Sequence, residues 1–122
     1  MLGSDFHYAV ARQARANRWE TITTNDIVLY IDGGATRIAR IDQIFGVSEQ
    51  APEAANRVVA CYGLATDFPI MSCTDRVITT GGAGATRLID MAHILHAAVW
   101  CCEGTGLAVI IPVSVRAAAL VD

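Results

Sequence analysis

The segment that most limits the fold lies between residues 27 and 45, where two β-forming stretches flank a turn. Ile27-Val-Leu-Tyr-Ile31 is a dense run of branched and aromatic side chains, which favour strands. Asp32-Gly33-Gly34 follows, and such glycine pairs are typical of tight turns. Residues 36–45 then place isoleucines as apolar anchors, so the segment predicts a strand–turn–strand hairpin.

Further short β-forming runs occur along the chain, at residues 57–62, 76–80, 86–89 and 107–115. Polar or glycine-rich loops separate them, and we expect most of the region from Leu64 to Thr80 to be irregular. Short strands separated by turn signals predict an all-β domain, mainly strands with short helices, in a small barrel-like arrangement.

The chain is predicted to consist of an N-terminal segment, residues 1–19, and a single β-rich domain, residues 20–122. Its 122 residues are the size of one domain and can bury a core without disulfides. Two interpretations of Ser4–Arg18 stay open. Its alanine-rich composition favours a helix, whereas the alternating apolar side chains from Phe6 to Val10 favour a strand.

The composition predicts apolar surface. Hydrophobic residues make up 53% and charged residues 17% of the chain, against about 45–50% and about 25% in typical domains. A domain of this size cannot hide so many apolar side chains, so we expect a protein partner or a homo-oligomer. The net charge is −3 and the sequence has no basic stripe, which makes nucleic acid an unexpected direct ligand.

The cysteines and the apolar runs bear on the compartment. Four cysteines are present, and the neighbouring pair Cys101 and Cys102 fits no secreted disulfide framework. The first residues lack a basic segment followed by an apolar one, so no secretory signal is expected. The longest apolar stretch, Gly106–Val115, is far shorter than the roughly 20 residues that span a bilayer. We therefore expect an intracellular protein without a membrane segment.

Two groups of residues could carry chemistry. Gly81–Ala85 is glycine-rich, but it lacks the Gly-Lys-Ser/Thr ending of a phosphate-binding loop. Zinc uses ligand types that occur close together here, in His93, His96, Cys101 and Cys102, although their spacing matches no standard site. We expect no cofactor, no metal site and no catalytic activity, and a small metal-binding or enzymatic domain centred on those four residues is the alternative.

Aromatic side chains are the other candidates for binding. Some could line a cage for a methylated ammonium group through cation–π attraction, but most are expected to fill the core. The candidate partner contacts are Trp19, Tyr30, Tyr62 and Trp100.

The hairpin segment resembles the opening of a bromo-adjacent homology (BAH) domain. The first strand matches at Asp26, Val28 and Tyr30, and the second at Ile38-Ala-Arg-Ile41 and at Ile44-Phe45. The resemblance implies a β-barrel adaptor that mediates protein contacts in chromatin, and hence a nuclear location. The chain departs from the family by lacking its aromatic-rich Trp-x-x-Arg-Pro-Glu segment, which leaves a methyl-lysine cage unsupported.

Two other resemblances involve the segment Thr86–Leu95. Together with the Ile-Ala-Arg-Ile stretch it is similar to C-terminal regions of fungal transposon-encoded proteins. By itself it is similar to part of the CheW-like adaptor fold of chemotaxis. We therefore expect a non-catalytic protein-interaction module, with a CheW-like signalling adaptor or a self-assembling structural protein as alternatives.

Overall fold

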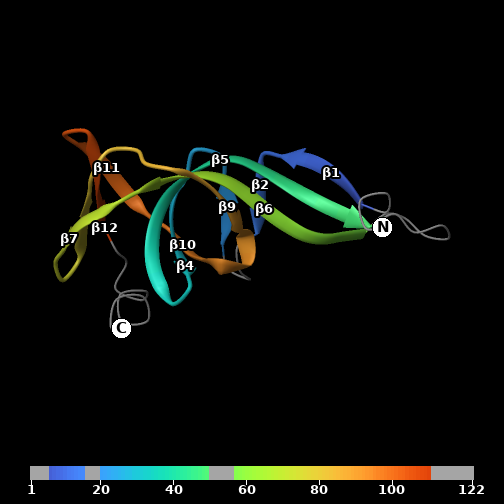
Figure 1. Ribbon diagram of the computed structural model, residues 1–122, viewed down its shortest axis with the longest axis horizontal. Coiled ribbons are helices and arrows are strands. Elements are labelled where there is room, and N and C mark those ends of the chain that lie inside the picture. The colour runs from blue at the N-terminus through green and yellow to red at the C-terminus, as the bar shows by residue number, and fades with distance from the viewer. Residues whose placement is uncertain (1–5, 16–19, 50–56, 111–122) are drawn as a thin grey trace.

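The computed structural model describes residues 6–15, 20–49 and 57–110, and the side chains of residues 9–15, 20–48 and 60–110. Twelve strands and one short 3₁₀ turn make up these ranges (Figure 1). The elements are β1 (Phe6–Ala11), β2 (Gln13–Arg15), β3 (Thr21–Thr23), β4 (Ile27–Asp32), β5 (Ala35–Glu49), β6 (Arg57–Phe68), β7 (Ile70–Cys73), β8 (Val77–Thr80), β9 (Thr86–Asp90), η2 (Met91–His93), β10 (Ile94–Ala97), β11 (Val99–Glu103) and β12 (Gly106–Ile110).

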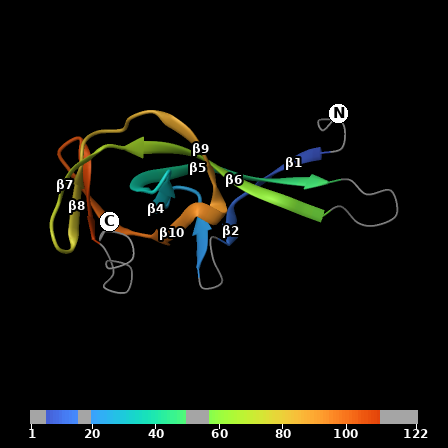
Figure 2. The ribbon, with the colours of Figure 1, turned by 60° about the horizontal axis from the view of Figure 1, so that its bottom comes forward.

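The largest sheet is antiparallel, with the order β10-β4-β5-β6-β9, and β1 also pairs with β5. The long strand β5 pairs with two strands along one edge. It pairs with β4 up to Arg40 and with β1 from Ile44 onward. Its other edge pairs with β6 along almost its whole length. The β1, β5 and β6 ends therefore project from the body as an arm (Figure 2).

The predicted hairpin is confirmed as β4 and β5, with Asp32 opposite Ala35. Gly33 and Gly34 have φ angles of +59° and +86°. Two successive residues with positive φ form the turn type whose twist matches that of the flanking strands, and glycine adopts it without steric cost.

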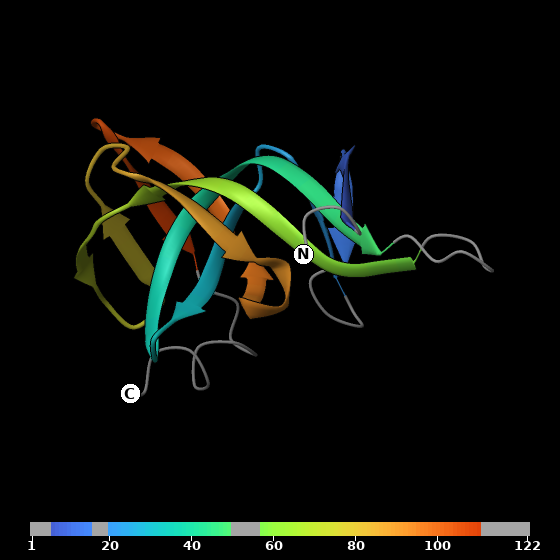
Figure 3. The same cartoon turned by 45° about the vertical axis from the view of Figure 1, so that its right-hand side comes forward.

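A second sheet has the order β11-β12-β8-β7, and β2 and β3 form a small third sheet. The second sheet lies at the end of the molecule opposite the arm (Figure 3). Gly106 begins β12 where it approaches β8. A Cβ atom at this position would lie 2.0 Å from the carbonyl oxygen of Thr80, so only glycine fits.

Strand β4 separates two hydrophobic clusters. Val28 and Tyr30 belong to a cluster inside the largest sheet, whereas Ile27 and Leu29 pack with residues of β8 and β12 in the other. Successive side chains of a strand point to opposite faces, so β4 is buried on both. Its unbroken apolar run is typical of such a strand.

The all-β class is confirmed, but the barrel is not. Strands β9 and β10 are the edges of the largest sheet, joined through η2 rather than paired with each other. The expected irregular region from Leu64 to Thr80 is also wrong, because β6, β7 and β8 occupy most of it. The open question at Ser4–Arg18 is answered by strands β1 and β2 for its described part. The last expected run becomes β12, and residues beyond Ile110 lie outside the described ranges.

Candidate functional site

The aromatic candidates do not form one site. Tyr30 is only 3% exposed because β4 is buried on both faces, so its ring is part of the core and not a partner contact. Tyr62 is half-buried on β6 and packs against Phe45, with ring centroids 6.1 Å apart. Trp100 is 42% exposed on β11, in the other sheet, and Trp19 lies outside the described residues.

Strand register gathers four charged side chains on the inner face of the largest sheet, which we call the ion quartet: Asp32, Arg37, Asp67 and Arg87. Arg37 stands opposite Tyr30, whereas Asp67 and Arg87 stand opposite Ala39 and Ala65. Opposite residues, and residues two apart along a strand, share a face. The quartet therefore continues the face that carries the core.

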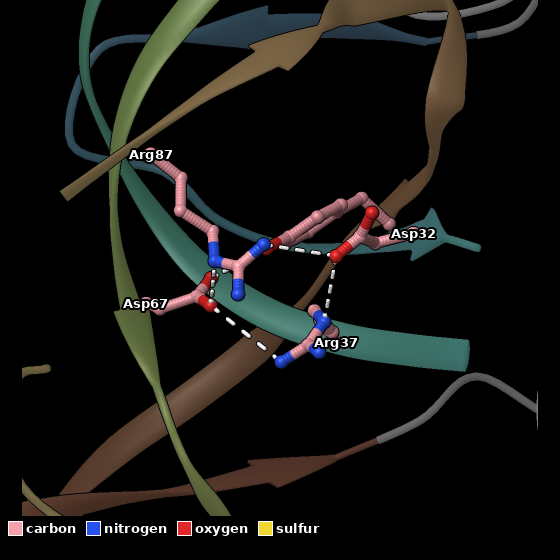
Figure 4. Close-up of polar contacts among 5 residues, drawn as sticks. Asp32, Arg37, Asp67 and Arg87 are labelled. Atoms are coloured by element: carbon pink, nitrogen blue, oxygen red, sulfur yellow. Dashed lines mark hydrogen bonds and ion pairs between the residues drawn. The ribbon is translucent and has the colours of Figure 1, made fainter. Parts of the chain in front are cut away.

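Side chains from β4, β5, β6 and β9 meet at the ion quartet (Figure 4). Arg87 of β9 reaches β4, where its Nη1 donates to Asp32 Oδ2 at 2.9 Å, and its Nε lies 2.7 Å from Asp67 Oδ2. Both carboxylates are thus held by one guanidinium, in the charge-assisted contacts that are the stronger hydrogen bonds of proteins.

Tyr30 anchors the ion quartet to the core. Its hydroxyl donates to Asp67 Oδ1 at 2.5 Å. Burial raises the pKa of this phenol above its ordinary value, and the hydrogen bond to Asp67 and the negative charge of that residue raise it further. Both oxygens of Asp67 therefore have a donor, and its side chain is only 13% exposed.

Arg37 is the weakly bound member. Its Nε lies 3.0 Å from Asp32 Oδ2, yet this buried nitrogen has no hydrogen-bond partner. Its Nη1 is 3.8 Å from Asp67 Oδ2, beyond hydrogen-bond distance. A guanidinium carries five N–H donors, so Arg37 brings more donor capacity to the quartet than these contacts use.

A groove of about 360 Å³ opens beside Arg37 and Asp67. It forms where β5 and β6 part, since their ladder ends at the pair Ile38 and Phe68 and Pro69 follows. Proline has no N–H with which to continue a ladder. Apart from Thr36, the remaining described wall is apolar, and it includes Ala35, Pro69, Ile70 and Ala85.

The glycine-rich segment Gly81–Ala85 borders this groove, and two of its five backbone amides are hydrogen-bonded to the strand region beside it. Gly81 donates to the carbonyl of Pro69 at 2.8 Å and Gly84 to that of Asp67 at 2.7 Å. A phosphate would need free backbone donors. These two bonds hold the groove wall in place and leave fewer amides to bind a phosphate.

The four residues of the metal alternative are not brought together. His93 lies in η2, His96 on β10, and Cys101 and Cys102 follow each other on β11, so their side chains point to opposite faces. His96 Nδ1 lies 3.1 Å from Glu20 Oε1. Across the described ranges, no group of three or more potential ligands could hold a metal ion.

The expected apolar surface lies mostly on the second sheet. Of the eight large hydrophobic side chains exposed among the described residues, six belong to this sheet: Ile70, Met71, Val77, Val99, Trp100 and Ile110. Val99 stands opposite Ile110 and Ile110 opposite Val77. These three form a row on the outer face, which we call the apolar row.

Sequence patterns did not point to the ion quartet or the groove, since their residues come from distant strands. Within the described residues, no helix is long and apolar enough to cross a membrane. Comparison with protein-family models, curated proteins and solved structures found no match to this chain.

Proposed function

We propose that this chain is a non-catalytic protein-interaction module that pairs with a second copy of itself through the outer face of the second sheet. The observation that carries this proposal is the apolar row. Val77, Ile110 and Val99 stand side by side on three adjacent strands and are 36%, 48% and 65% exposed. Exposed apolar side chains gathered in register mark an interaction surface, whereas scattered ones do not.

A second copy suits this face because the face is nearly uncharged. The next row outward consists of Cys101, Ala108, Thr79 and Ser72. In a two-fold dimer the same patch meets itself, so an uncharged apolar row would pack on an identical row without burying charges. Strand β11 also forms an edge of the sheet, and all five of its residues are exposed. Such an edge offers backbone groups for pairing with another chain.

The test is the molar mass in solution, measured by size-exclusion chromatography with light scattering over a range of concentrations. The wild-type chain is expected to be a dimer. Val99→Asp places a charge in the apolar row and should give monomers. Val10→Asp is the matched control, because Val10 is 71% exposed on a strand at the other end of the molecule. It should leave the dimer intact.

Circular dichroism checks that both variants keep the wild-type fold. A wild-type monomer at every concentration would overturn self-association. A Val99→Asp variant that dimerises like the wild type would show that the apolar row is not the interface.

The BAH resemblance supports a further proposal, that the interaction module acts in chromatin. It rests on the strand residues of β4 and β5 that match the family. Binding of the wild-type chain to immobilised histone-tail peptides is the expected result, and the absence of binding to every tail would count against a chromatin role.

A further inference from the structure

We propose that the groove beside Arg37 binds a carboxylate attached to a small apolar body, either a free carboxylic acid or the C-terminal residue of a peptide. This site is separate from the apolar row and does not depend on self-association. Three features support this site: the volume of the groove, its lining and the unequal pairing within the ion quartet.

Donors and acceptors in the groove wall are unequally used. Among the described residues that line the groove, Asp67 and Arg37 are the charged ones. Asp67 accepts from Tyr30 and from Arg87, one donor for each oxygen. A cation entering the groove would thus compete with donors already in place, whereas Arg37 has donors to offer.

The Arg37 guanidinium is incompletely hydrogen-bonded within the ion quartet. Its buried Nε faces Asp32 Oδ2 at 3.0 Å without forming a hydrogen bond, and its Nη1 stays 3.8 Å from Asp67 Oδ2, so the outer N–H groups of the guanidinium remain for a ligand. The side chain is nevertheless 41% exposed, so a ligand can reach it. Guanidinium groups pair with carboxylates through two parallel hydrogen bonds, a geometry that suits a planar acid.

The size and the apolar walls of the groove limit the rest of the ligand. A volume of about 360 Å³ lies at the lower end of the range of small-molecule pockets. Ala35, Pro69, Ile70 and Ala85 provide apolar walls around Arg37, the usual combination of an apolar pocket with a few polar anchors. The groove therefore favours a short aliphatic group beside the carboxylate over a large or highly charged ligand.

Local rigidity supports this assignment. Asp67 N donates to Ala85 O at 2.9 Å, and Gly84 N donates to Asp67 O at 2.7 Å, so two sides of the groove are tied together. The hydroxyl of the buried Tyr30 donates a hydrogen bond to Asp67 and holds its carboxylate in place. A groove formed before the ligand arrives loses little entropy on binding.

The experiment titrates the whole chain with four probes while its amide NMR spectrum is recorded. The probes are isovalerate, isovaleramide, and a short peptide ending in valine with either a free or an amidated C-terminus. At millimolar concentrations, the two probes with a free carboxylate, or one of them, should shift the backbone NMR signals of Gly84 and Ala85. Isovaleramide and the amidated peptide should leave these signals unchanged. Binding of isovalerate alone identifies a free acid as the ligand, and binding of the free peptide alone identifies a C-terminus.

Two variants and one control locate the site. Arg37→Gln should weaken carboxylate binding by about 10-fold or more, the loss expected for a charge-assisted hydrogen bond. Ala85→Leu should abolish binding by filling the groove while every charge is kept. Arg12→Gln removes an exposed arginine elsewhere and should bind like the wild type. Equal binding of amides and acids, no binding of any probe, or unchanged binding by both groove variants would overturn the proposal.

Discussion

Replacing Tyr30 with phenylalanine tests whether the core holds the ion quartet in place. The hydroxyl of this buried side chain donates to Asp67 at 2.5 Å. A hydrogen bond to a charged acceptor contributes about 1.5–3 kcal/mol, and Asp67 would keep its ion pair with Arg87 after the change. We therefore expect Tyr30→Phe to lower the free energy of unfolding by about 2 kcal/mol near neutral pH.

The same substitution has a distinct signature in alkaline solution. Burial and the contact with Asp67 raise the pKa of Tyr30 in the folded state, whereas an unfolded tyrosine ionises near pH 10. The contribution of the protonated phenol is complete below pH 10 and is lost as the pH rises from there through the higher folded-state pKa. In that window the unfolded state binds fewer protons, so stability falls by up to about 1.4 kcal/mol per pH unit.

Urea unfolding at a series of pH values, from neutral to strongly alkaline, measures both effects. The Tyr30→Phe variant should start less stable and lose stability more slowly above pH 10 than the wild type. Tyr62→Phe is the control, because it removes a hydroxyl from the outer, half-buried part of β6. Equal neutral stability and parallel alkaline slopes for Tyr30→Phe and the wild type would refute the argument.

The remaining predictions concern Gly104 and Gly106 at the turn between β11 and β12, the core and an outer carboxylate. Gly106→Ala should destabilise by at least about 3 kcal/mol, because its Cβ would collide with backbone, whereas Gly104→Ala, at a φ of +60° in open space, should cost about 1–2 kcal/mol in urea unfolding. Ile41→Ala, which empties a fully buried site, should cost about 2–5 kcal/mol in the same assay. Burial raises the pKa of Asp42, but hydrogen bonds from Thr66 and Arg40 outweigh it and lower the pKa. Its contribution is therefore present above about pH 4 and lost at lower pH, so Asp42→Asn should flatten the acid decline of the melting temperature.

The hairpin of β4 and β5 could be predicted because its signals are local. A run of branched side chains and two glycines at a turn depend only on neighbouring residues. Pro69 predicts an irregular region after Leu64, because proline is rare inside strands. In the structure Pro69 falls between β6 and β7, where no ladder hydrogen bond is required of it.

Exposed apolar side chains were expected from the composition, and the structure has them, but composition does not locate them. Composition alone indicates that apolar side chains must be exposed, and the second sheet exposes most of them. It cannot say which ones, because exposure depends on how sheets stack. Tyr30 illustrates this limit, since the second sheet covers one face of β4 and the curved larger sheet encloses the other.

The ion quartet could not be predicted from spacing, because its members come from four strands and meet only through register and curvature. Each taken alone is an ordinary polar residue next to a turn or within a strand. The same geometry explains why the groove can be tested without unfolding the protein. Its floor depends on the buried Tyr30 and on Asp67, whereas Arg37 and Ala85 stand at its exposed rim. Substitutions at the rim should therefore change binding while stability is kept, and a change at Tyr30 should alter stability first.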